Sequence, residues 1–234
     1  MDFFSFDLPS QKPESPEVPI PKEKFSIPYP DSIAKQWRRL ELISPEELYQ
    51  EKLSLRSMQR KHDEVLDEYI KMVDEMYVRR CGYCILNDEC LNLIAKYTPI
   101  IEMGAGLGFI ASLLAKKGVD INCYDIITPD KNDYFPKRSK MHYPVIQAEE
   151  NIVKNFPDRT LLLIWPPYDE PMAFDILSQY TGDTFIYIGE DRDGCNGDDN
   201  FFKLLEEKWQ SVKYRWVARH NMVHDGLNIY KRKN

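Results

Sequence analysis

The segment from Ile100 to Gly108 constrains the fold of this chain more than any other stretch. It runs from mostly apolar residues into a turn with glycine at positions 104, 106 and 108, and an apolar pattern typical of a helix follows. Glycine lets the backbone turn tightly and approach a ligand, and a helix beginning near Leu107 would direct its free N–H groups to the same place. The segment predicts a strand, a ligand-binding loop and a helix in an α/β sheet.

Glu102 indicates which kind of ligand suits this loop. Dinucleotide-binding loops usually read Gly-x-Gly-x-x-Gly, whose third glycine would fall at Phe109, and they hold a pyrophosphate dianion. A carboxylate two residues before the first glycine would repel that dianion, whereas it suits a ligand with an ammonium and a sulfonium. The next predicted strand, 119–124, is followed by Asp125, which can accept hydrogen bonds from ribose hydroxyls. The alternative is a structural turn that binds no ligand.

These features together resemble the S-adenosylmethionine site of class I methyltransferases. The resemblance rests on Glu-x-Gly-x-Gly-x-Gly followed by an acid at the end of the next strand. It implies an α/β fold with a seven-stranded, mostly parallel sheet and helices on both faces, and S-adenosylmethionine as the cofactor. The expected cofactor-binding residues are Glu102, Gly104, Ala105, Gly106, Gly108, Asp125, Glu149 and Trp165.

A second motif ends a strand that the sequence predicts to be buried on both faces. An unbroken apolar run over 161–165 stops at Pro166-Pro167-Tyr168. Each proline pushes the residue before it into extended geometry, so the carbonyl of Pro166 should point in a fixed direction. The motif resembles the (Asp/Asn/Ser)-Pro-Pro-(Tyr/Phe/Trp) signature of amino-group methyltransferases. The resemblance implies that the Pro166 carbonyl and the Tyr168 ring hold the acceptor, which favours a nitrogen acceptor.

Trp165 departs from that signature, because an indole donates a hydrogen bond but does not accept one. With Trp-Pro-Pro-Tyr at this point, the chain resembles a group of methyltransferase-like proteins that share this variant. The face of Trp165 could stabilise a sulfonium by about 1 kcal/mol. Equally, the side chain could simply pack beneath the cofactor.

Acidic residues near this motif are candidates for proton transfer. Asp169 follows the diproline turn, and Glu190 follows Gly189 just beyond the strand predicted over 184–188. Either carboxylate could accept a proton or orient the acceptor. The predicted catalytic residues are Trp165, Pro166, Tyr168, Asp169 and Glu190.

The cysteines and histidines do not predict a metal site. Cys81 and Cys84 with Cys90, and His220 with His224, have spacings that occur in zinc sites, but no second Cys-x-x-Cys completes either group. The total of five cysteines is odd, which argues for reduced thiols rather than a disulfide scaffold.

Three regions follow one another along the chain. Prolines concentrated in residues 1–30 predict a flexible tail. Residues 31–98 form a predicted helical extension, in which Ser44-Pro45-Glu46-Glu47 is a capping box that begins a helix. Residues 99–234 form the predicted cofactor-binding domain. Its last two strands, 212–219 and 227–231, are joined through the hairpin signal Asp225-Gly226.

The net charge and the hydropathy of the chain limit which kinds of acceptor, membrane contact and location we expect. A formal net charge of −7 disfavours tight non-specific binding to nucleic acid, so a small molecule or a protein is favoured as the acceptor. No apolar run approaches the length needed to span a bilayer, and the first residues lack the basic start of a secretory signal. We therefore expect no membrane contact and a cytoplasmic location.

The sequence thus predicts an enzyme, an S-adenosylmethionine-dependent methyltransferase that methylates a nitrogen on a small molecule or protein. One alternative is a non-catalytic module of the same fold that binds a protein partner through its tail or helices. The other is a methyltransferase that acts on a nitrogen of a nucleic-acid base.

Overall fold

The computed structural model describes residues 33–58, 64–127, 131, 135, 139–217 and 223–233. The predicted tail over 1–30 and His220 lie outside these residues. The centre of the molecule is a seven-stranded sheet with the order β3-β2-β1-β4-β5-β7-β6. Only β7 runs antiparallel to its neighbours β5 and β6, and the other paired strands are parallel. The strands are β1 (Ile100–Met103), β2 (Ile121–Asp125), β3 (Val145–Gln147), β4 (Thr160–Ile164), β5 (Thr184–Gly189), β6 (Trp209–Trp216) and β7 (Gly226–Arg232).

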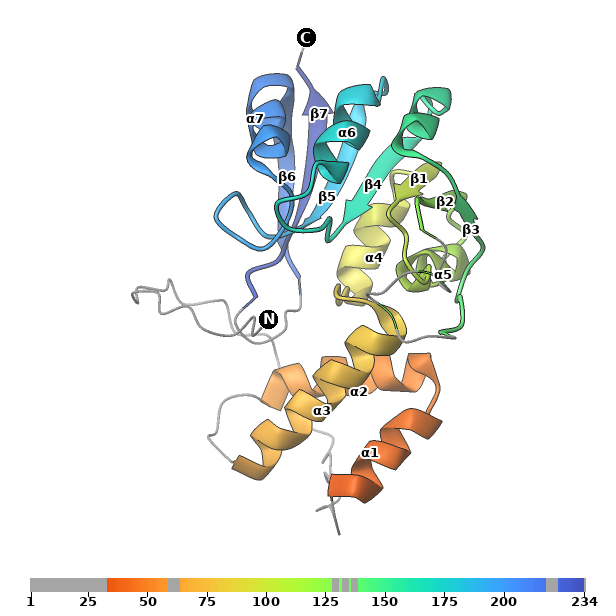
Figure 1. Ribbon diagram of the computed structural model, residues 1–234, viewed down its shortest axis with the longest axis vertical. Helices are drawn as coiled ribbons and strands as arrows, with labels where there is room; N and C mark the ends of the chain where they lie inside the picture. The colour runs from red at the N-terminus through yellow and green to blue at the C-terminus, as the bar shows by residue number, and fades with distance from the viewer. Residues whose placement is uncertain are drawn as a thin grey trace.

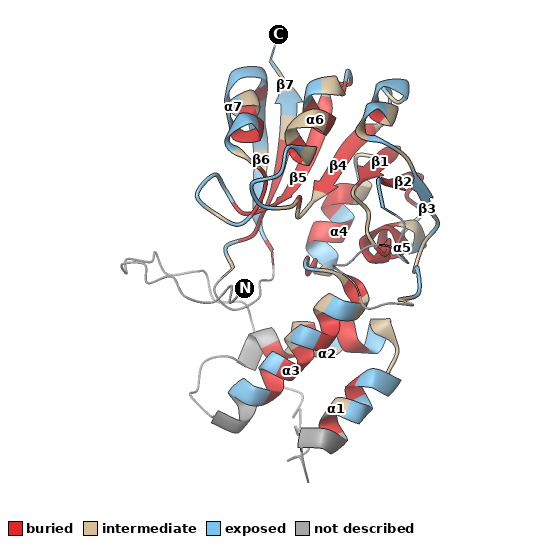
Figure 2. Cartoon of the chain, viewed as in Figure 1, coloured by how far each residue is buried: buried red, intermediate tan, exposed pale blue. Residues whose placement is uncertain are grey.

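Helices cover both faces of this sheet, which confirms the predicted fold (Figure 1). Alternate strand residues supply two cores, with Ile100 and Leu162 in one and Ile101 and Leu161 in the other. The central strands are therefore buried on both faces, as parallel strands usually are (Figure 2). One face packs against α4 (Asp88–Ala95) and α5 (Phe109–Lys116), and the other against the 3₁₀ helix η1 (Glu150–Asn155), α6 (Met172–Gln179) and α7 (Asp199–Lys208).

The helical extension consists of α1 (Ile33–Leu42), α2 (Pro45–Met58) and α3 (Glu64–Cys81). The predicted capping box is confirmed, because the backbone N–H of Ser44 donates to Glu47 Oε2 at 2.7 Å and the N–H of Glu47 donates to Ser44 Oγ at 3.1 Å. In Figure 1 the three helices lie below the sheet, beyond the end towards which the β4 arrow points. They therefore stand at the carboxyl edge of the parallel strands.

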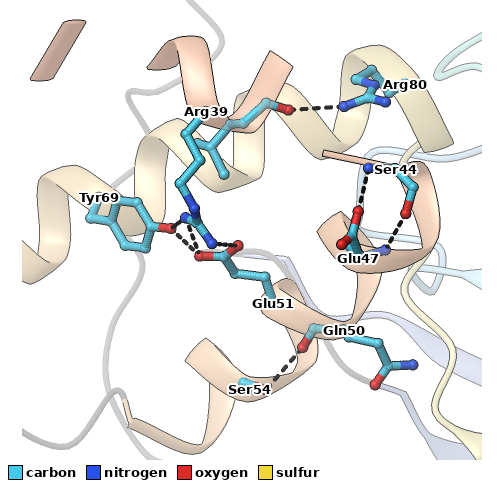
Figure 3. Close-up of polar contacts among 9 residues, drawn as sticks. Arg39, Ser44, Glu47, Gln50, Glu51, Ser54, Tyr69 and Arg80 are labelled. Atoms are coloured by element: carbon cyan, nitrogen blue, oxygen red, sulfur yellow. Dashed lines mark hydrogen bonds and ion pairs between the residues drawn. The ribbon is translucent and has the colours of Figure 1, made fainter. Parts of the chain in front are cut away.

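A polar network ties the three helices to one another (Figure 3). The guanidinium of Arg39 on α1 donates to both carboxylate oxygens of Glu51 on α2, at 3.0 and 2.9 Å. It also donates to the hydroxyl of Tyr69 on α3 at 2.8 Å, and that hydroxyl donates to Glu51. Two parallel N–H···O bonds fix both distance and orientation. The network therefore links side chains of α1, α2 and α3.

Phe109, the first residue of α5, joins the extension to the sheet. The rings of Tyr49 on α2 and Tyr77 on α3 meet the Phe109 ring edge-on, with centroids 5.9 and 6.1 Å away. The ring of His142 also meets the Phe109 ring edge-on, with centroids 5.2 Å apart. One continuous apolar core consequently includes both the extension and one face of the sheet. The position that would carry the third glycine of a dinucleotide loop carries an aromatic anchor here.

The glycine-loop helix begins later than predicted. α5 begins at Phe109 rather than near Leu107. The backbones of Gly106 and Gly108 are left-handed, with φ of 55° and 70°, and an α-helix cannot contain such residues. The loop is therefore longer, and the helix amino terminus lies beyond it.

The carboxyl-terminal hairpin also differs from its prediction. β6 begins at Trp209 instead of 212, and β7 begins at Gly226, so Asp225-Gly226 is not a tight turn between the strands. Gly226 instead lies against the ring of Tyr214, so a side chain at that position would require the ring to move. The glycine reflects packing, which a local turn signal cannot reveal.

Candidate cofactor and acceptor site

The glycine loop connects β1 to α5, and its backbone contains residues in the left-handed conformation. A Cβ on Gly106 would lie 3.0 Å from the ring of Phe135, and one on Gly108 would lie 3.0 Å from the carbonyl oxygen of Tyr143. Both positions also have positive φ, which side chains rarely adopt. The loop therefore requires glycine for two separate reasons, its conformation and the close approach of neighbouring residues.

Asp125 connects the end of β2 to this loop. Its Oδ2 accepts the backbone N–H of Gly106 at 2.8 Å, and its Oδ1 accepts the N–H of Ile127 at 3.1 Å. Burial raises the pKa of this carboxyl, and the hydrogen bond from Gly106 partly offsets that rise. Each carboxylate oxygen can accept a further hydrogen bond. Two sequence-predicted cofactor residues, Gly106 and Asp125, thus lie in direct contact.

Glu102 is buried beneath the loop, on the face of the sheet that carries α4 and α5. It is 3% exposed, and the thiol of Cys123 donates to its Oε2 at 3.5 Å. Burial raises the pKa of Glu102 from 4.5 to about 8. The sequence suggests a charged carboxylate at this position, whereas its burial in this structure favours the protonated form. A cation placed nearby would favour its ionised form.

Trp165 occupies an unusual backbone conformation directly after β4. Its φ is 50°, and its N–H donates to the carbonyl of Ile188 at 2.9 Å. In a regular strand consecutive side chains face opposite ways, yet Ile164 and Trp165 both pack against the α4–α5 core. The left-handed turn therefore redirects the indole. There it stacks on Tyr83, with ring centroids 5.2 Å apart and planes 15° from parallel.

Asn196, which was not predicted from the sequence as a site residue, forms a hydrogen bond to the diproline turn. Its side-chain amide donates to the carbonyl oxygen of Pro166 at 3.1 Å, and its Oδ1 accepts the N–H of Glu190 at 2.8 Å. Asn196 is 1% exposed, so these bonds are shielded from water. One acceptor position of the Pro166 carbonyl is therefore already used. No sequence motif marks this asparagine, because its partners are distant along the chain.

Glu190 anchors the loop that contains Asn196. Its carboxylate accepts the backbone N–H of Cys195 at 2.8 Å and that of His224 at 2.6 Å, and the residue is 5% exposed. The carboxylate therefore connects the loop after β5 to the segment before β7. A role in proton transfer would require the carboxylate to release one of these bonds.

The remaining predicted residues lie at the surface of the same edge. Tyr168 is 64% exposed, and Asp169 is exposed with a φ of 55°. The N–H of Asp169 donates to the carbonyl of Gly197 at 2.9 Å, which ties the motif to the loop after β5. Glu149 is exposed at the start of η1, next to Ala148, whose N–H donates to the Asp125 carbonyl at 3.0 Å. It therefore lies on the β3 side of the glycine loop.

Several apolar and aromatic residues around the loop were not predicted from the sequence. Ile126 and Ile127 follow Asp125 and are 43% and 39% exposed. Tyr83 comes from the segment between α3 and α4. The isoleucine pair could have been found from its place after Asp125, whereas nothing local indicated Tyr83.

Neither a metal cluster nor a membrane span is found in the described part of the chain. No three His, Cys, Asp or Glu side chains there are grouped so that they could hold a metal ion. No described helix has both the length and the apolar character needed to cross a bilayer.

Comparison with known proteins finds no sequence-level relative: no protein-family model and no curated protein matches the chain. Several solved structures resemble it weakly. A SAM-dependent methyltransferase from Archaeoglobus fulgidus has a TM-score of 0.39 and 13% identity, covering 60% of this chain and 90% of that one. TrmN from Thermus thermophilus has a TM-score of 0.42 and 12% identity, covering 62% and 48%. A variant of MtNAS bound to S-adenosylmethionine has a TM-score of 0.42 and 12% identity, covering 86% and 76%.

Likenesses this weak carry no argument about function. The fold class follows from the sheet itself. The sheet has five parallel strands, and β7 is inserted antiparallel between β5 and β6 at one end. With helices on both faces, this arrangement is the class I methyltransferase fold.

Proposed function

We propose that this protein is an S-adenosylmethionine-dependent methyltransferase. One observation carries the proposal: at the carboxyl edge of the sheet, the Asp125 carboxylate accepts the N–H of Gly106 within a left-handed glycine loop. In open α/β sheets ligands bind at this edge. The contact places an acidic hydrogen-bond acceptor beside a loop that can approach a ligand closely.

The residues around the loop fit this cofactor. Asp125 would accept hydrogen bonds from the ribose hydroxyls, and the exposed side chain of Ile126 would cover the adenine, with Glu149 at its edge. Gly104, Ala105, Gly106 and Gly108 would let the loop backbone approach the methionine part, above Glu102. S-adenosylmethionine supplies a methyl group that is already activated by its sulfonium. The protein therefore has mainly to align the acceptor.

The acceptor would lie against the diproline turn. Asn196 fixes the Pro166 carbonyl, which keeps a second lone pair for an acceptor N–H. The exposed ring of Tyr168 would form the outer wall, and Asp169 or Glu190 would orient the nucleophile. We propose a nitrogen acceptor on the Pro-Pro-Tyr resemblance. A small molecule or a protein is favoured over a nucleic acid because of the net charge of −7.

A non-catalytic binding module is the second candidate. Two observations favour it: Trp165 stands where the amino-group signature has a hydrogen-bond acceptor, and the Glu190 carboxylate is already engaged by two N–H groups. Such a module would bind a protein partner through the extension. Methyl transfer to a nucleic-acid base is the less favoured catalytic alternative.

Thermal unfolding with added ligand tests the proposal directly. A ligand at about 100 times its dissociation constant stabilises the folded state by roughly 2.7 kcal/mol, so we expect a clearly raised melting temperature with S-adenosylmethionine or S-adenosylhomocysteine. Adenosine triphosphate at the same concentration serves as the control, and we expect it to give a much smaller shift. An unchanged melting temperature with both ligands would refute the proposed cofactor.

The contribution of Asp125 to cofactor binding can be separated from its hydrogen bond with the Gly106 N–H. We expect Asp125→Ala to weaken S-adenosylmethionine binding by roughly 1.5 to 3 kcal/mol, the usual worth of a hydrogen bond to a charged group. Asp125→Asn keeps an acceptor for the Gly106 N–H and should lose less. Asp120→Ala, just before the opposite end of β2, is the matched control, because Asp120 pairs with Arg159 far from the loop. Equal affinity in wild type and Asp125→Ala would remove Asp125 from the site.

A further inference from the structure

Tyr83 reaches the candidate site from the helical extension. It lies in the short segment between α3 and α4, and the helices on either side hold that segment in place. The hydroxyl of Tyr77 donates to the Cys84 carbonyl at 2.9 Å, and the hydroxyl of Tyr49 donates to the Leu86 carbonyl. Both tyrosines also pack against Phe109 at the start of α5. The extension and the glycine-loop helix therefore fix the position of Tyr83 together.

The partner of Tyr83 is Trp165, whose left-handed backbone brings the indole to this face. The two rings are nearly parallel, with centroids 5.2 Å apart. Ala105, in the glycine loop, packs against the same apolar core as Trp165. β1 and β4 are adjacent strands, with Met103 paired to Leu163. The stacked pair thus stands beside the loop where the methionine part of the cofactor would lie.

The carboxylates of the site would attract a positively charged sulfur, but each is engaged by backbone N–H groups or is buried beneath the loop. The Asp125 carboxylate is bonded to the loop backbone, and that of Glu190 is bonded to two N–H groups. Glu102 is buried, and its burial raises the pKa of its carboxyl. Aromatic faces are a further kind of group at this place that attracts a cation, because the ring quadrupole is negative above the ring.

We propose that Tyr83 and Trp165 form a two-ring wall that recognises the sulfonium of the methyl donor, with Tyr83 as the positioning residue that holds the indole. This inference rests on the proposed function. It assigns to the extension a specific part in cofactor recognition: the wall favours the cationic donor over its product, S-adenosylhomocysteine, whose sulfur is neutral. Product release after methyl transfer would be assisted in the same way.

The ratio of two dissociation constants tests this wall without knowledge of the acceptor. Binding of S-adenosylmethionine and of S-adenosylhomocysteine is measured by calorimetry for wild type, Tyr83→Ala and Tyr83→Phe. We expect Tyr83→Ala to weaken binding of the cationic donor about fivefold, the order of one cation–π contact, with little change for the product. Tyr83→Phe keeps the ring and should behave as wild type. Tyr97→Ala, a half-buried tyrosine between α4 and the start of β1, is the matched control and should leave the ratio unchanged.

The possible results are distinct. Equal weakening of both ligands in Tyr83→Ala would mean that the tyrosine only supports the fold, and two unchanged dissociation constants would mean that it plays no part; either overturns the wall. Trp165→Leu gives a second measure, because its ratio should change at least as much as that of Tyr83→Ala. Wild type that binds neither ligand would overturn the proposed function, and the wall with it.

Discussion

The free energy of unfolding of this protein is expected to fall as the pH rises from 4.5 to about 8, and replacement of Glu102 by glutamine is expected to remove most of that fall. In this range an unfolded chain has lost the Glu102 proton, whereas the folded protein keeps it because the carboxyl is buried. The folded state then binds more protons, so its free energy of unfolding falls by roughly 1 kcal/mol for each unit of rising pH. Below pH 4.5 both states are protonated, and above about 8 both are ionised, so the slope disappears at both ends.

The measurement is denaturant unfolding of the ligand-free protein at a series of pH values. Glutamine has nearly the same shape as glutamate and does not titrate, so the difference between the two curves isolates Glu102. This difference is needed because burial raises the pKa of Asp125 too, which adds a slope of the same sign. Glu149→Gln, at an exposed position, is the control and should follow wild type. Parallel curves for wild type and Glu102→Gln would show that the folded state does not raise this pKa.

Gly106→Val is expected to abolish cofactor binding and to lower stability. The position has a φ of 55°, which a β-branched residue adopts only at a cost of roughly 1 to 3 kcal/mol. The new side chain would also press against the ring of Phe135, 3.0 Å from the Cβ position, and would occupy space above the loop. Calorimetric titration with S-adenosylmethionine and a melting curve give the two quantities.

Gly118→Val separates the two effects. Gly118 follows α5, has a φ of 83°, and has no atom within 4 Å of the Cβ position. Its replacement therefore brings backbone strain without crowding and away from the loop. We expect Gly118→Val to lose stability and to keep cofactor binding. A folded Gly106→Val protein that bound S-adenosylmethionine normally would place the cofactor elsewhere.

The cofactor half of the candidate site was largely predictable because its residues are local. Gly104, Gly106 and Gly108 lie in one loop, and Asp125 follows the next strand, which pairs with the first. Adjacent parallel strands bring their carboxyl ends together, so the contact between Asp125 and Gly106 follows from order along the chain. What sequence reasoning missed here was the protonation of Glu102, because a pKa depends on burial and not on residue type.

The acceptor half was predictable in location but not in detail. The run over 161–165 and the two prolines indicated a buried strand ending at a binding edge, and the structure has β4 ending there. The hydrogen bonds that Asn196 makes to Pro166 and Glu190 were not foreseeable, since the partners are brought together by loop packing. The left-handed backbone of Trp165 was also unexpected, because such a conformation is rare for a large side chain.

The sequence by itself determined the order of the strands and of most helices, the glycine loop, the acid after the second strand and the capping box at Ser44. These depend on hydrophobic periodicity and backbone preference, which act over a few residues. Only the tertiary structure decided that Phe109 anchors the extension through Tyr49 and Tyr77, and that Tyr83 stacks on Trp165. Contacts of this kind join residues far apart in the chain, and they form where burial of apolar surface outweighs the entropy lost on ordering the segments between them.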